Sequence, residues 1–217
     1  GLPVYGDKAV YYSDLKLSNQ GLQGSGSLRF MSSDSESPGF MFYPDSLVAD
    51  LTKFSIIEQE GPPSFPQVYA EGVHQFWLPE LDVMRLNTLP GKEFSMYDGK
   101  LLHSGRLSLT SAGLLGRGSS RFENAEMASN TFVFKNQSFN SDTTDFRLFY
   151  PERPTISLTT RVYPGKVDFK RRIGTFGSPG KSVKIELPLR RYICYMDRIE
   201  WHMNANELYL TNSLARR

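Results

Sequence analysis

The chain has 217 residues, of which 39% are hydrophobic and 22% charged, with eleven Tyr, fifteen Phe and two Trp. This composition is too apolar and aromatic for a disordered chain, and the length suffices for one large or two small domains. Cys194 is the only cysteine, which excludes an intrachain disulfide and a zinc site made of cysteines.

The net charge of +2 is unevenly distributed along the chain. Residues 1–108 carry eight Lys or Arg against thirteen Asp or Glu, a net charge of −5, whereas residues 109–217 carry seventeen against ten, a net charge of +7. Two basic runs in the second half are candidates for binding a polyanion such as an acidic glycan or lipid headgroups. They are Lys170, Arg171 and Arg172, and Arg190 and Arg191. The alternative is a solvated sheet face of alternating charge.

A long internal repeat defines the organisation of the chain. The stretch GLQGSGSLRF at 21–30 returns as GLLGRGSSRF at 113–122, and a shift of 92 residues aligns 15–56 with 107–148 without a gap. Sixteen of the forty-two aligned pairs are identical. We therefore expect a first repeat unit over 1–95 and a second over 96–203, with 204–217 as the start of a third unit or a tail.

Alternating apolar residues along both units predict β-strands. Apolar pairs two residues apart recur along the chain, Phe40 and Phe42 or Phe132 and Phe134 among them, with mostly polar residues between or beside the pairs as a group. Turn formers such as YGD, YPDS and YDG separate them. Glycine is costly inside a strand, so the repeated glycines at 24 and 26 and at 116 and 118 predict a bulge, a tight bend or a close backbone approach. Short helices are expected at 78–89, where Pro79 fits a first helical position, and at 122–130.

The predicted fold class is therefore all-β, built as a diverged tandem repeat with at most one or two short helices. A solenoid-like or extended stacked β-sheet is favoured over two β-sandwich domains, because the apolar segments are interrupted at intervals too short for most sandwich strands.

No catalytic or cofactor motif withstands inspection. GTFGSPGKS at 174–182 ends like a phosphate-binding loop, but position 175 is Thr instead of the required glycine. The three histidines are scattered, and Cys194 lies in an apolar run that predicts burial. Trp77, with Glu80 and Asp82 beside it, is a candidate sugar-stacking residue. We expect no metal and no cofactor.

The segments LTSAGLLGRGSSRFENAEMASNTFVF and FNSDTTDFRL resemble very large β-repeat proteins of Bacteroidota envelopes. The LxGxG strands are also similar, in the spacing of glycines and strands alone, to the groove-forming repeats of AsmA/TamB-type lipid-handling proteins. The first resemblance covers about residues 95–150 and their N-terminal copy. It implies an exported, structural or assembly role, and it transfers no functional residue.

These observations favour a non-enzymatic segment of an exported envelope protein, acting as a scaffold or binding surface in the periplasm or at the cell surface. Alternatives are a glycan-binding or glycan-active module and lipid or lipopolysaccharide handling through an apolar groove. The expected partners are other envelope proteins, glycan or anionic lipid, with nucleic acid disfavoured. No apolar run approaches the roughly 18 residues of a membrane helix. No signal peptide opens the chain, and the initial Gly leaves room for a removed export signal.

Overall fold

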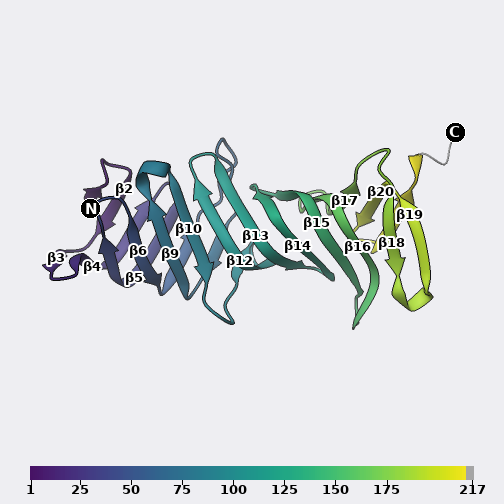
Figure 1. Ribbon diagram of the computed structural model, residues 1–217, viewed down its shortest axis with the longest axis horizontal. Helices are drawn as coiled ribbons and strands as arrows, with labels where there is room; N and C mark the ends of the chain where they lie inside the picture. The colour runs from purple at the N-terminus through teal and green to yellow at the C-terminus, as the bar shows by residue number, and fades with distance from the viewer. Residues whose placement is uncertain (214–217) are drawn as a thin grey trace. The chain divides into compact units, whose positions relative to one another are not determined.

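The computed structural model describes residues 1–213 and confirms the predicted all-β class (Figure 1). Antiparallel strands form almost all of the regular structure, and two short 3₁₀ turns are the helical elements among the described residues. The chain divides into two compact units, Gly1–Gly116 and Arg117–Arg217, so the division falls inside strand β13 (Gly113–Phe122). The predicted repeat boundary at 95/96 lies within the first compact unit, because a sequence period and a compact unit are different divisions of the chain.

The strands of the first unit form two layers. One layer holds the first part of β4 (Gly21–Phe30) and the second parts of β5 (Ser33–Phe42) and β12 (Leu101–Thr110). It also holds β3 (Leu15–Ser18), β6 (Leu47–Leu51), β9 (Val73–Leu78) and β10 (Val83–Thr88). The other holds the remaining parts of these long strands with β1 (Leu2–Val4), β2 (Ala9–Tyr12), β7 (Lys53–Ile56), β8 (Val68–Ala70) and β11 (Phe94–Met96). Three ten-residue strands, β4 (Gly21–Phe30), β5 (Ser33–Phe42) and β12 (Leu101–Thr110), therefore take part in both layers.

Two glycines mark the point where β4 passes between the layers. The register of β4 against β5 shifts between Gly24 and Gly26, which is a β-bulge. Gly26 has φ +157°, and a Cβ atom there would lie 2.5 Å from the carbonyl oxygen of Tyr12. A Cβ atom at Gly24 would collide with the hydroxyl of Tyr11. For Gly24 and Gly26, the predicted bulge and the predicted close approach are both confirmed.

Aromatic rings fill the space between the two layers of the first unit. Trp77 of β9 lies edge-on to Tyr5, with ring centroids 5.3 Å apart, and its centroid is 4.8 Å from that of Phe30 at the end of β4. Tyr11 packs edge-on against Phe40 and Phe42. Such ring pairs add to the stability gained from burying their apolar area.

A long hairpin, β15 (Ser138–Tyr150) and β16 (Arg153–Asp168), organises the second unit. The first part of β16 pairs with β18 (Val183–Leu187), which pairs with β19 (Tyr192–Met196). The last part of β16 pairs with β17 (Ile173–Gly177), which pairs with β20 (Arg198–His202) and through it with β21 (Glu207–Thr211). β16 therefore joins two groups of strands, and it passes from one to the other between Thr160 and Gly165.

The core of the second unit lies between these groups of strands. Phe146 of β15 stacks on Phe176 of β17 with ring centroids 4.0 Å apart, and Trp201 of β20 contacts Phe122 and Phe146. All four side chains are buried. Their burial follows the period of two that the sequence predicts.

The two predicted helices are largely wrong. At 78–89 a single 3₁₀ turn, η1 (Pro79–Leu81), begins at the predicted proline but ends at Asp82, whose left-handed φ of 52° redirects the chain into β10. At 122–130 the chain makes a turn at Glu123 (φ 50°) and continues as β14 (Ala125–Phe134). The local helix propensity is overridden there because Ala125 and Met127 are buried as alternate residues of a strand.

Backbone features recur at an offset of 92 residues. β1, β4 and β5 have the same lengths as β11, β13 and β14, and each pair starts 92 positions apart. Tyr5 and Tyr97 both have left-handed φ values, 53° and 55°, as do Met31 and Glu123, 54° and 50°. The hydrogen bond from Ile57 N to Ser32 O (2.9 Å) corresponds to that from Phe149 N to Asn124 O (2.8 Å). The two segments therefore follow the same succession of strands and turns.

The predicted third unit at 204–217 begins in the turn before β21. Residues 204–213 form that turn, the strand and the residues after it, and residues 214–217 lie outside the described part of the chain.

Candidate functional site

Trp77, the predicted sugar-stacking residue, is fully buried at 0% exposure. Its ring lies between Tyr5 and Phe30 in the core of the first unit, so neither face is available to a sugar. The prediction that Trp77 binds a ligand is therefore wrong. Strand alternation explains the error, because position 77 faces inward on β9 together with Val73 and Gln75.

The basic run at 170–172 forms the turn between β16 and β17. Lys170 and Arg171 are exposed, and the backbone N–H of Arg171 donates to Asp168 Oδ1 at 2.9 Å. Arg172 has a structural role, since its guanidinium pairs with Glu123 and its Nε donates to Asn204 Oδ1 at 3.0 Å. Only two of the three predicted residues are therefore open to a ligand.

Arg190 and Arg191 lie at the opposite end of β16 from the first basic run. Arg190 ends the turn η2 (Pro188–Arg190), Arg191 has a left-handed φ of 51°, and both side chains are exposed. This turn packs near the beginning of β16, where Leu189 lines a small depression with Arg153, whereas the first run follows the end of β16. The structure does not join the five predicted basic residues into one patch.

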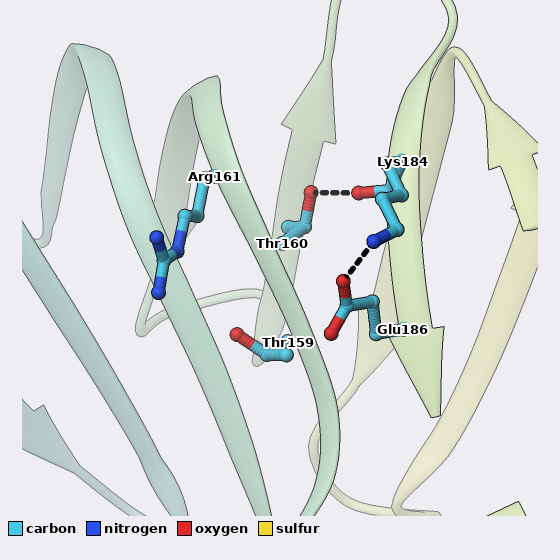
Figure 2. Close-up of a pocket in the computed structure, with 5 residues that line it drawn as sticks. All are labelled: Thr159, Thr160, Arg161, Lys184 and Glu186. Atoms are coloured by element: carbon cyan, nitrogen blue, oxygen red, sulfur yellow. Dashed lines mark hydrogen bonds and ion pairs between the residues drawn. The ribbon is translucent and has the colours of Figure 1, made fainter. Parts of the chain in front are cut away.

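A recess between β16 and β18 is the best-defined candidate site, with a volume of about 370 Å³ (Figure 2). It is lined by Thr159, Thr160, Arg161, Lys184 and Glu186. It exists because β16 and β18 pair only at Thr159–Glu186 and Thr160–Ile185, after which β16 leaves to join β17.

A bulge in β16 contributes to the shape of this recess. Between the pairs Thr160–Phe146 and Tyr163–Thr144, β16 has one more residue than β15. Bulges of this kind bend a strand and redirect its side chains. Arg161 lies within this irregular stretch and lines the recess.

Hydrogen bonds and an ion pair fix the side of the recess formed by β18. Thr160 Oγ1 donates to the carbonyl oxygen of Lys184 at 3.0 Å, and Lys184 Nζ forms an ion pair with Glu186 (Figure 2). The hydrogen bond between Lys184 and Glu186 raises the pKa of Lys184 and lowers the pKa of Glu186. Both side chains therefore stay charged at neutral pH and compensate each other.

Arg161 adds a second, exposed cation to the recess. No ion pair joins it to a carboxylate among the described residues, but its charge acts on Glu186, whose pKa it helps to lower after the larger effect of Lys184. The five lining residues carry two cations and one anion, so the recess has a net charge of +1. An arginine fork of this kind suits a carboxylate, a sulfate or a phosphate.

Strand β19 continues the recess as an exposed apolar surface. Tyr195 lies opposite Lys184 and Ile193 opposite Glu186 in the β18–β19 pairing, and they are 60% and 52% exposed. Cys194 between them is buried, and this burial raises the pKa of its thiol. The thiol is therefore suited to packing and not to nucleophilic attack.

The recess could not be found from the sequence by the motifs considered. Its residues belong to two short stretches, 159–161 and 184–186, that are polar and contain no recognised spacing. Alternation in KIEL and YICYM identifies faces of each strand, but the pairing of Thr159 with Glu186 depends on the course of the chain between them.

Within residues 1–213, no group of three His, Cys, Asp or Glu side chains is arranged to hold a metal ion. No helix in this range is long and apolar enough to cross a membrane. Comparison with known proteins gives no match to a family model, a curated protein or a solved structure.

Proposed function

We propose that the chain is a non-enzymatic segment of an exported cell-envelope protein, in which a duplicated β unit forms a structural scaffold that carries a binding surface. The observation that supports this best is the recurrence of strands, left-handed turns and backbone hydrogen bonds at an offset of 92 residues. Duplication of a strand-rich unit extends a sheet without needing new chemistry.

The residues that recur are structural ones. Gly24, Gly26 and Phe30 have identical counterparts 92 positions later, and these residue types set bulges, close approaches and the core. The recess of β16 and β18 lies beyond residue 149, where the alignment of the two copies ends. This distribution supports a division of roles, with repeated residues building the scaffold and unrepeated residues shaping a surface.

The envelope location and the partnership with other envelope proteins rest on the resemblance to β-repeat proteins of Bacteroidota envelopes. The cysteine content leaves the compartment open, because a chain with a single buried cysteine gains nothing from an oxidising compartment and loses nothing in it.

Lipid handling through an apolar groove has weaker support. In the described residues the space between the layers is occupied by rings such as Phe54, Phe65, Phe132 and Phe146, all fully buried. A groove for an acyl chain needs apolar surface that is open to it.

Fractionation of the organism that encodes the chain tests the proposal. An antibody against residues 1–213 is expected to detect the protein in the envelope fraction, where shaving of intact or osmotically opened cells with a protease should remove it. A cytosolic marker enzyme serves as the control. Recovery with that marker in the soluble cytosol, protected from the protease, would show that the proposal is wrong.

A further inference from the structure

The outer face of β16, β18 and β19 combines three kinds of side chain in one ordered surface. Thr159, Glu186 and Ile193 lie in register across the three strands, since Thr159 pairs with Glu186 and Glu186 with Ile193. Lys184 and Tyr195 form the next cross-strand pair, and Arg161 lines the same recess. Directly opposed residues share one face of a sheet, so hydroxyl, charged and aromatic groups are adjacent here.

The charges of this surface favour an anionic ligand with few charges per unit length. Arg161 forms no ion pair among the described residues and acts on Glu186 only through its longer-range charge, whereas Lys184 is paired with Glu186 directly. A dense polyphosphate needs several free cations in a row, and the Glu186 carboxylate in the middle of the recess opposes it. The same carboxylate accepts hydrogen bonds from neutral hydroxyl groups, as sugars present.

The aromatic part of the surface favours a flat ligand with an apolar face. The Tyr195 ring is held at its base by the β18–β19 pairing but is mostly exposed, and Ile193 on the same face of the strand is also exposed. Tyrosine offers a large contact area at low entropic cost. A sugar ring has the required combination of an apolar face and a polar edge.

We propose that this face binds an acidic polysaccharide, with a uronic acid carboxylate at Arg161, sugar hydroxyls at Thr159 and Glu186, and a sugar ring against Tyr195. The proposal names the ligand of the binding surface proposed above and rests on that function. Tyr195 takes the place of Trp77 as the expected aromatic contact, because the Trp77 side chain is buried.

Affinity electrophoresis in gels containing polygalacturonate tests this assignment, with dextran as the neutral polymer. The described chain is expected to be retarded by polygalacturonate and not by dextran. Arg161→Gln should weaken binding by at least about tenfold, the loss of one hydrogen-bonded charge. Tyr195→Ala should weaken it by about fivefold, the loss of one ring contact.

Two control variants remove an arginine charge and a tyrosine ring outside the proposed site. Arg171→Gln removes an exposed charge from the β16–β17 turn, and Tyr209→Ala removes a ring that is 54% exposed on β21. Both should bind polygalacturonate like the unmodified chain. Circular dichroism of each variant before and after heating establishes that it is folded.

Equal weakening by Arg161→Gln and Arg171→Gln would overturn the proposal, since it would indicate general charge attraction. Tighter binding to duplex DNA or to phosphatidylglycerol vesicles than to polygalacturonate would also overturn it, in favour of a polyphosphate or a membrane surface. If the protein is recovered in the envelope but is not retarded by polygalacturonate, this inference is wrong and the scaffold function is unaffected. If the protein is retarded but is recovered in the cytosol, this inference stands and the proposed envelope function is wrong.

Discussion

Ser35 of β5 and Gln75 of β9 form a hydrogen bond between the two layers of the first unit. The hydroxyl donates to Gln75 Oε1 at 2.7 Å, and both side chains are fully buried. Gln75 Nε2 is buried without a hydrogen-bond partner among the described residues. This pair is therefore one of the few polar contacts in an interior otherwise made of aromatic and aliphatic groups, where an unpaired polar atom is expensive.

Removing the hydroxyl of Ser35 should destabilise the chain more than removing both partners. Ser35→Ala leaves Gln75 Oε1 unpaired, and we expect the free energy of unfolding to fall by about 1–3 kcal/mol. The double variant Ser35→Ala, Gln75→Met should recover most of that loss, because neither position then carries an unpaired buried polar atom. Urea unfolding followed by tryptophan fluorescence measures both. Additive losses in the double variant would contradict the argument.

The close approach at Gly26 should make this glycine far less replaceable than Gly39 in the neighbouring strand. Gly26→Ala places a Cβ atom 2.5 Å from Tyr12 O and 2.6 Å from Ser13 Cβ, so the β2–β4 contact must open. We expect a loss of about 1–3 kcal/mol, typical of overpacking. Gly39→Ala meets no atom within 4 Å and should change stability by no more than about 0.5 kcal/mol. Similar urea midpoints for the two variants would refute this explanation of the repeated glycines.

Much of the fold follows from local patterns in the sequence, because strand alternation is a local property. Phe40 and Phe42, predicted as an inward pair, are both buried, and the bulge predicted from Gly24 and Gly26 is present. The beginning of the strand at Ala125–Phe134 was missed because residues 122–130 favour a helix in isolation, whereas its end was predicted from Phe132 and Phe134. Its inward face is set by packing against β15, which local propensity does not represent.

The site was less accessible to prediction, because it depends on which strands become neighbours. Sequence reasoning selected Trp77 for its chemistry, although its place in the alternation puts it in the core. It grouped Arg171 with Arg190 by charge, although β16 separates them. Arg161 and Lys184 carry no motif and meet only because β16 leaves β18 after Thr160.

The thiol of Cys194 should react slowly in the folded chain. Its side chain is 7% exposed, and burial raises its pKa, so both access and the thiolate fraction are reduced. We expect Ellman's reagent at pH 8 to modify one thiol per chain quickly in 8 M urea and only slowly in buffer. The replacement Ile193→Ala, on the outer face, should leave the slow rate unchanged. Rapid reaction of the native chain would place Cys194 at the surface and contradict the inward face assigned to β19.

Asp197 should make the chain sensitive to acid. This buried carboxylate accepts hydrogen bonds from the backbone N–H of Gly180 (2.9 Å) and of Ser213 (3.1 Å), and also from the Ser213 hydroxyl. The Ser213 hydroxyl is the largest cause of a lowered pKa at Asp197, followed by the Gly180 N–H. Hydrogen bonds from His202 and then Arg198 likewise lower the pKa of Glu200. Groups with a lowered pKa in the folded state stabilise it fully above their unfolded pKa, about 3.9 for Asp, and lose this contribution as the pH falls through the folded value.

The melting temperature should therefore be nearly constant from pH 7 to about pH 5 and should fall steeply below about pH 4. Asp197→Asn should melt lower than the unmodified chain at pH 7 and lose less on acidification, with Glu200 and Glu186, whose pKa values are also lowered, supplying the remaining slope. The matched variant Asp142→Asn changes an exposed carboxylate and should keep the full acid dependence. If Asp197→Asn and the unmodified chain lost stability in parallel between pH 5 and pH 3, the turn at Gly180 and Ser213 would not be held by an ionised Asp197. Because these hydrogen bonds tie Gly180, which precedes β18, to Ser213, which follows β21, the same variant should also increase hydrogen exchange at the backbone N–H of Gly180.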